Sequence, residues 1–276
     1  MEIWHRVTFG HRDGVDAEIE MLNLRYKKSP LPGGGYLIHL EVSESAPKWP
    51  VIHSMIQRTR ALDISDTLFT DTEILVAPWS RLIPVFEQGY PQPEATWSAE
   101  PVTFGGECSE CGIYKKEQLE NFRIRKEPRL GNNSFVSLYW TYALFATPAV
   151  FAELATRKLQ GFREWKVLIH KTDQISENIS QIYIPEQTSA DFVPEETFRR
   201  SKCPKCGAVK YFPHLRGVMR FKGKISESTT DFLLSREWFG DGHAAYREIL
   251  VSKEVARLIV ESKLRGVKLK PIQINP

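Results

Sequence analysis

Cysteine is scarce in this chain. Its 276 residues include only four cysteines, which form two Cys-x-x-Cys-Gly units, Cys108-Ser-Glu-Cys111-Gly112 and Cys203-Pro-Lys-Cys206-Gly207. The first residues, Met1-Glu2-Ile3-Trp4-His5-Arg6, lack the apolar run of a secretory signal. We therefore expect a cytoplasmic protein whose thiols stay reduced, which disfavours two structural disulfides.

Catalytic signatures are also missing. None of the seven histidines occurs in a His-Glu-x-x-His spacing, and there is no nucleophile elbow. The run Gly33-Gly34-Gly35 lacks the Lys-Ser/Thr of a phosphate loop and predicts a plain turn. His214 and His243 are the nearest candidates for chemistry, but both positions are more typical of surface or loop residues. We expect no enzymatic activity.

No stretch is convincing as a membrane span. Residues 135–152 carry no charge, but Ser137, Thr141 and Thr147 interrupt the apolar run and Pro148 follows. A strand over Phe135 to Trp140, followed by a helix capped by Thr147 with Pro148 at its first position, explains this composition better. We expect no membrane association.

The spacing of the cysteines predicts a metal site. Two cysteines that flank two residues form a tight knuckle, and the following glycine can take the left-handed conformation that turns amide groups toward the sulfurs. Two knuckles supply the four thiolates of one structural Zn(II) per chain, with Cys108, Cys111, Cys203 and Cys206 as ligands. A redox dithiol is the alternative for Cys203 and Cys206, but it would start a helix, and here a glycine and a β-rich stretch follow.

The long spacing between the knuckles has an explanation in an internal repeat. Ninety-one residues separate Cys111 from Cys203, against roughly 15 to 20 in the familiar two-knuckle signature. With an offset of 105 and no gap, the helix cap Thr147 aligns with Ser252 and the stop Gly161 with Gly266. The knuckles are offset by 95, so we expect about ten residues gained near Glu237 to His243.

We therefore predict an α+β protein with two parts. Residues 1–100 form an N-terminal α+β region, with a strand over Tyr36 to Val42 and a helix around Val51 to Ala61. The connector Gly89-Tyr90-Pro91-Gln92-Pro93 marks the boundary. Residues 101–276 form a zinc-bridged, internally duplicated strand-helix-strand domain, with pseudo-repeats at about 101–172 and 197–276.

Positive charge gathers around the second knuckle. The net charge is only +3, yet residues 197–226 hold nine basic residues and no acidic one, so the rest of the chain sums to −6. Aromatic Tyr211, Phe212 and Phe221 alternate with these cations, a mixture that suits phosphate contacts and base stacking. Zinc-ribbon-like nucleic-acid binding through residues 199–224 is thus one hypothesis. The other is that Lys202, Lys205 and Lys210 offset the charge of a zinc tetrathiolate.

The chain resembles a known bacterial family. The two Cys-x-x-Cys-Gly units, the preceding Gly89-Tyr90-Pro91-Gln92-Pro93 and the ending from Ile249 through Gly266 to Pro271 are similar to the double-CXXCG motif proteins. The resemblance covers about residues 88–276. Some members of that family are classed as immunity proteins of toxin systems. The resemblance implies a non-enzymatic protein that neutralises a cognate toxin, encoded by a neighbouring gene, through direct binding.

Overall fold

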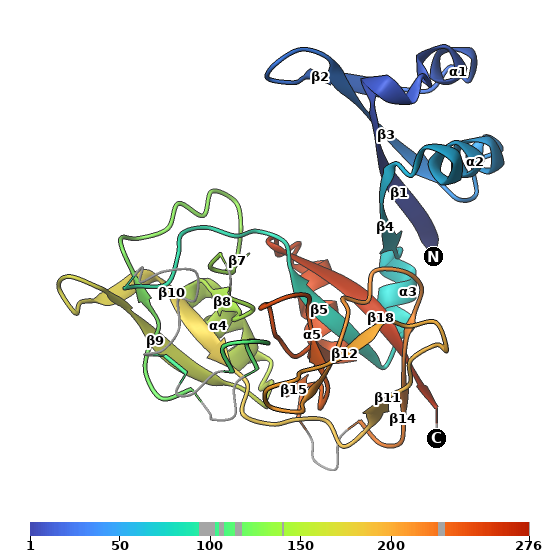
Figure 1. Cartoon of the computed structure of the whole chain (residues 1–276). Coiled ribbons are helices and arrows are strands. Elements are labelled where there is room, and N and C mark those ends of the chain that lie inside the picture. Colours follow the sequence, from blue (N-terminus) through green and yellow to red (C-terminus); the bar gives the residue numbers. More distant parts are fainter. Residues whose placement is uncertain (94–102, 105–107, 114–117, 140, 226–229, 276) are drawn as a thin grey trace. The chain divides into compact units, whose positions relative to one another are not determined.

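The computed structural model covers the whole chain and describes all residues except 94–102, 105–107, 114–117, 140, 226–229 and 276 (Figure 1). It is a mixed α+β structure dominated by sheets, as the sequence predicts. The chain forms two compact units, Met1–Thr70 with Leu215–Gly217, and Asp71–His214 with Val218–Pro276. The first unit ends at Thr70, whereas the boundary predicted at residues 100 and 101 lies outside the described residues.

The first unit alternates strands and helices in the order β-α-β-β-α-β. Its elements are β1 (Glu2–Gly10), the 3-10 turn η1 (His11–Asp13), α1 (Asp16–Met21), β2 (Tyr26–Pro30), β3 (Tyr36–Ser43), α2 (Trp49–Thr59) and β4 (Leu62–Leu68). All neighbouring strands are antiparallel in the order β2-β3-β1-β4. This is the ferredoxin-like arrangement, which supports many unrelated functions and identifies none. The predicted strand and helix are present as β3 and α2.

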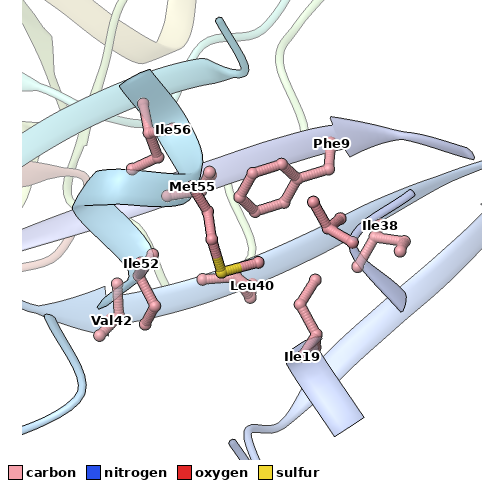
Figure 2. Packing of buried hydrophobic residues seen from close by; sticks show 10 residues of the cluster. Phe9, Ile19, Ile38, Leu40, Val42, Ile52, Met55 and Ile56 are labelled. Carbon is pink, nitrogen blue, oxygen red and sulfur yellow. The ribbon is translucent and has the colours of Figure 1, made fainter. Parts of the chain in front are cut away.

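One face of this sheet carries the core of the first unit (Figure 2). Alternate residues of β1 and β3 point to the same side because successive side chains of a strand face opposite ways. Phe9, Leu40 and Met55 meet between these strands and α2. Both helices cover this face, through the buried side chains Ile19, Ile52, Met55 and Ile56.

The second unit contains two larger sheets and one small one. Its helices are α3 (Asp71–Val76), α4 (Pro148–Thr156) and α5 (Lys253–Glu261). The five-stranded sheet has the order β6-β9-β10-β8-β7 and the six-stranded sheet β11-β14-β18-β5-β17-β15, while β12, β13 and β16 form a three-stranded sheet. The strands are β5 (Trp79–Pro84), β6 (Arg123–Ile124), β7 (Phe135–Val136), β8 (Phe145–Ala146), β9 (Arg163–Ile169), β10 (Ile175–Tyr183), β11 (Asp191–Phe192), β12 (Arg200–Lys202), β13 (Val209–Tyr211), β14 (Met219–Lys222), β15 (Phe232–Leu234), β16 (Trp238–Phe239), β17 (Ile249–Ser252) and β18 (Val267–Asn275).

The predicted helices α4 and α5 have similar ends but differ in their capping. Their N-caps Thr147 and Ser252 both have extended backbone, yet only Ser252 Oγ accepts a capping hydrogen bond, from Val255 N at 3.4 Å, and Thr147 makes no such side-chain bond. After each helix the chain turns through a left-handed lysine, with φ of 56° at Lys158 and 51° at Lys263. The uncharged stretch is divided among β7, β8 and α4 rather than forming one span. β7 is shorter than predicted, and the predicted end Trp140 lies outside the described residues.

The two larger sheets share one plan of strand pairing. Phe135 of β7 lies opposite Ala146 of β8, and Phe232 of β15 lies opposite Val251 of β17. The parallel pair β6 and β9 likewise corresponds to β14 and β18. The order β6-β9-β10-β8-β7 therefore recurs as β14-β18-β5-β17-β15. The aligned helices and glycines of the sequence thus lie in structurally equivalent places.

The chain of the second unit passes from one larger sheet to the other after each of the two central strands, β5 and β10. β10 in the five-stranded sheet is equivalent to β5 in the six-stranded sheet, because Ser180 lies opposite Lys166 and Ser80 opposite Pro271, an offset of 105. The chain after β5 then runs to the five-stranded sheet, where Gln88 N donates to Ser137 O at 2.9 Å. The chain after β10 runs to the six-stranded sheet, where Thr188 N donates to Leu234 O at 2.8 Å. The predicted repeat limits omit both central strands.

The connection between β15 and β17 is longer than the one between β7 and β8. Phe135 of β7 and Phe232 of β15 are 97 residues apart (232 − 135), whereas Ala146 of β8 and Val251 of β17 are 105 apart (251 − 146). The difference is eight residues (105 − 97). The longer connection contains β16 and the loop that follows it.

Candidate metal centre

Each cysteine pair forms a turn with the same backbone hydrogen bonds. Gly112 N donates to Cys108 O at 2.8 Å, and Gly207 N donates to Cys203 O at 2.9 Å. Both glycines are left-handed, with φ of 70° and 73°, a conformation that glycine adopts without the steric penalty of a side chain. The second knuckle is the tip of the β12–β13 hairpin. These knuckles are the local structure expected from the Cys-x-x-Cys-Gly spacing.

The fold brings all four predicted cysteines together. The Sγ atoms of Cys108 and Cys203 are 3.8 Å apart, those of Cys111 and Cys206 are 3.6 Å apart, and all four lie within 4.8 Å of one another. A tetrahedral ion with metal–sulfur bonds of about 2.3 Å requires sulfur–sulfur separations of about 3.8 Å. The four cysteines are therefore positioned to bind a metal ion.

The knuckle backbone favours the thiolate form of the leading cysteines. Hydrogen bonds from the backbone of Glu110 and Cys111 lower the pKa of Cys108 to about 6. The backbone of Cys206 does the same for Cys203, whose pKa is also lowered. In contrast, burial raises the pKa of the Cys111 thiol to about 12. Since metals bind thiolates, a bound cation would supply the stabilisation that Cys111 lacks.

Lys210 connects the first knuckle to the loop that follows β16. Its side chain is buried, and Nζ donates to Cys111 O at 3.0 Å and to the carbonyls of Gly242 and Ala244 at 2.7 Å each. Burial lowers the pKa of Lys210. A buried ammonium with three acceptors is a structural link, and it places a positive charge beside the sulfur cluster.

The other two lysines expected near the cluster differ from Lys210. Lys205 Nζ donates to Ser109 Oγ at 2.6 Å and so joins the two knuckles, whereas Lys202 is exposed. The sequence did not predict that the loop around His243 contacts the first knuckle, where the His243 carbonyl lies close to Gly112. No local motif marks that loop, because its contact with the knuckle is made across the fold.

Apolar side chains pack around the four cysteines. Cys108, Cys111 and Cys203 are buried together with Ile113 and Ala245, and Cys206, Ala208 and Trp238 pack against them. Four sulfurs complete a tetrahedral shell, whereas a catalytic zinc site keeps one position for water or substrate. The arrangement suits a metal ion with four sulfur ligands.

Some side chains of the basic segment, residues 197–226, make contacts within the protein. The Phe221 side chain is fully buried, and the Arg199 guanidinium lies 4.0 Å from the Phe212 ring. Arg216 belongs to the first unit, where its Nη2 donates to both carboxylate oxygens of Glu44 at 3.0 Å.

The two histidines considered for chemistry lie in loops. His243 is exposed, but His214 is buried rather than at the surface, and Arg81 Nη1 donates to its carbonyl at 3.0 Å. Arg81 also forms a buried ion pair with Glu248 at 2.6 Å. His214 is thus part of the core of the second unit.

Comparisons with protein-family models, curated proteins and solved structures found no match for this chain. Among the described residues, no helix has the length and apolar character needed to cross a membrane.

Proposed function

We propose that one Zn(II) per chain binds Cys108, Cys111, Cys203 and Cys206 and acts as a structural joint between the two halves of the second unit. The sulfur arrangement is the observation that carries this proposal, because each half supplies one knuckle to a single tetrahedral set. A structural zinc contributes on the order of 10 to 16 kcal/mol in small peptide systems. That is comparable with a whole domain's stability of about 5 to 15 kcal/mol.

Metal analysis of the full chain tests the zinc site directly. We expect one equivalent of zinc after purification without chelator, and its release when all four thiols are modified. Cys206→Ser is expected to lose the metal, while Ser109→Ala, within the first knuckle but at a position that supplies no sulfur ligand, retains it. Purified protein without metal, or native cysteines that react freely with a thiol reagent, would contradict the proposal.

The two halves are further proposed to descend from one duplicated unit. Support comes from the shared strand pairing and from reciprocal contacts between the halves. Ser134 N donates to Arg265 O and Asp231 N donates to Gln160 O, each at 2.9 Å. Residues 160 and 265 are related by the same offset of 105 as the helices. A duplicated unit that first paired with a second copy of itself would generate such reciprocity.

At the level of biological function, we propose a non-enzymatic immunity protein that neutralises a cognate bacterial toxin by direct binding. The resemblance of the two Cys-x-x-Cys-Gly units and the flanking segments supports this role, and the closed cysteine set is consistent with a binding protein. A metal joint that fixes the two knuckles to each other would present a rigid surface to a partner, which reduces the entropy lost on binding.

Co-expression with the flanking gene is the decisive experiment. We expect a stable one-to-one complex in a pull-down and protection of cells from the toxin. Failure to bind or protect against every adjacent toxin-like gene would overturn the immunity role. Binding of an oligonucleotide that weakens steeply with salt, and weakens further in the combined Arg216→Ala, Arg220→Ala and Lys222→Ala variant, would instead support nucleic-acid binding.

A further inference from the structure

A cavity lies where the two halves of the second unit meet. Its volume is about 150 Å³. One wall comes from the first half, including Phe122 and Leu144, and the other from the second half, including Trp238 and Tyr246. Tyr142 and Tyr246, one from each half, stack with their ring centroids 3.9 Å apart. The cavity is therefore formed by the joining of the halves.

The cavity has the size and lining for one aromatic ring. A cavity of about 150 Å³ lined by apolar side chains is large enough to hold benzene. Aromatic and aliphatic side chains make up most of the described lining, and the aromatic ones are Phe104, Phe122, Tyr142, Tyr183, Trp238 and Tyr246. Among the described residues that line the cavity there is no aspartate, glutamate, lysine or histidine.

Two buried carboxamides add polarity to the lining. Gln118 Nε2 donates to Gln181 Oε1 at 2.8 Å, and Gln181 Nε2 donates to Gln118 Oε1 at 2.7 Å. Gln118 Nε2 also donates to Glu120 O at 2.8 Å. Because Gln181 Nε2 carries two hydrogens, one N–H remains for an acceptor on a ligand.

Arg247 is the one charged side chain among the described lining residues. Its guanidinium lies 4.5 Å from the centroid of the Trp238 ring. Its Nη1 donates to the neutral acceptors Gln187 Oε1, Ser235 O and Arg236 O at 2.9, 2.7 and 2.5 Å. Within the part of the chain that the structure describes, no carboxylate forms an ion pair with Arg247.

Because no described carboxylate pairs with Arg247, its side chain is a candidate partner for an anionic ligand. Burial lowers the pKa of Arg247, and the charge of Glu237 opposes that effect. However, Glu237 Oε1 accepts a hydrogen bond from Phe192 N at 3.0 Å. Arg247 is partly buried, and a nearby anion favours the charged form of a partly desolvated cation. A planar guanidinium stacked on tryptophan suits a carboxylate, which it can bind through two parallel hydrogen bonds.

We propose that this cavity binds a small aromatic monocarboxylate, with its ring between the aromatic walls and its carboxylate on Arg247. The site is separate from the metal centre in chemistry but shares Trp238 and Ala245 with the packing around the sulfurs. Loss of the metal is therefore expected to weaken the site as well. The proposal does not depend on a toxin partner.

Benzoate and the nearly isosteric neutral benzamide are the matched probes. We expect the metal-loaded full chain to bind benzoate at least tenfold more tightly than benzamide, as measured by calorimetry or ligand-observed NMR. Arg247→Gln should reduce benzoate affinity to that of benzamide and leave benzamide affinity unchanged. Arg236→Gln, which alters a neighbouring arginine outside the lining, is the control and should preserve the preference.

A second variant separates loss of the site from loss of folding. Ala143→Leu adds bulk to the cavity wall and should weaken both ligands at least tenfold in a chain that retains its zinc and its circular dichroism spectrum. Equal affinities for benzoate and benzamide, or an unchanged preference in folded Arg247→Gln, would overturn the proposal. No binding of either ligand to the metal-loaded protein would overturn it as well.

Discussion

At the scale of single residues, the two knuckle glycines have the same backbone but different surroundings. A Cβ atom on Gly112 would lie 1.9 Å from His243 O, whereas a Cβ on Gly207 would meet nothing within 4 Å. The left-handed conformation alone therefore explains glycine at position 207. At position 112 the close approach of another loop adds a second reason.

This difference predicts unequal effects of the same substitution. Gly207→Ala is expected to destabilise the metal-loaded protein by about 1–2 kcal/mol, the cost of a left-handed non-glycine residue. Gly112→Ala should cost about 2–5 kcal/mol, because the new methyl group also displaces the loop at His243. Chemical denaturation of both variants measures the difference. Equal losses would show that the loop moves aside without cost.

A single buried histidine predicts part of the response to acid. Burial, followed by the charge of Arg81, lowers the pKa of His214 from 6.5 to about 4. Between these values the unfolded chain binds a proton that the folded chain does not, so stability is complete above about pH 6.5 and falls as the pH drops toward 4. The full contribution is on the order of 3 kcal/mol.

Replacement of His214 tests this pH dependence. In His214→Gln the loss of stability between pH 6.5 and 4 should be smaller by that amount, as followed by thermal or chemical unfolding at each pH. His53→Gln changes an exposed histidine of the first unit and should leave the dependence as it is. Identical profiles for the native chain and His214→Gln would contradict the assignment.

At the scale of elements, each larger sheet has a central strand, and after that strand the chain continues into the other larger sheet. Leu82 of β5 and Ile182 of β10 hold equivalent places and are both buried. β5 pairs with β17 and β18, whereas β10 pairs with β8 and β9. A defect in one central strand is thus expected to act on the sheet that surrounds it, and for β5 the partner strands lie far away in sequence.

Hydrogen exchange distinguishes the two sheets. Leu82→Ala should cost about 2–5 kcal/mol and increase exchange in β17 and β18 more than in β8 and β9. Ile182→Ala, the matched change, should do the reverse. If both variants increased exchange equally in all four strands, the two sheets would unfold as one unit.

At the scale of the whole molecule, the metal centre and the cores of the two units are separate sources of stability. All four cysteines belong to the second unit, while the first unit has its own core on one face of its sheet. The residues 215–217 join the first unit through contacts such as the hydrogen bond from Gly217 N to Thr67 Oγ at 2.8 Å.

Removal of the metal should therefore act unevenly. On chelation we expect a large increase of hydrogen exchange around both knuckles and in the loop at His243, with loss of cooperative unfolding of the second unit. Exchange in α2, whose core contains no cysteine, should stay close to that of the metal-loaded chain. Equal loss of protection in α2 would contradict independent folding of the first core.

Much of this local structure was predictable because its causes are close together in sequence. The alternating residues of Tyr36 to Val42, the caps Thr147 and Ser252, and the glycine after each cysteine pair act within a few residues. The strand after Phe135 was predicted too long, since an apolar composition alone does not tell where pairing stops. The burial of Lys210 could not be predicted, because its three acceptors come from distant loops.

The sequence by itself determined that two equivalent knuckles exist, that two equivalent helices follow them, and that four sulfurs are available for one metal ion. Only the tertiary structure decided that β5 lies within the six-stranded sheet, that β10 lies within the five-stranded sheet, and that the four sulfurs converge. It also placed Arg247 in the lining of a cavity to which both larger sheets contribute. The physical reason is that turns and caps are local, whereas strand pairing and burial depend on which distant segments meet.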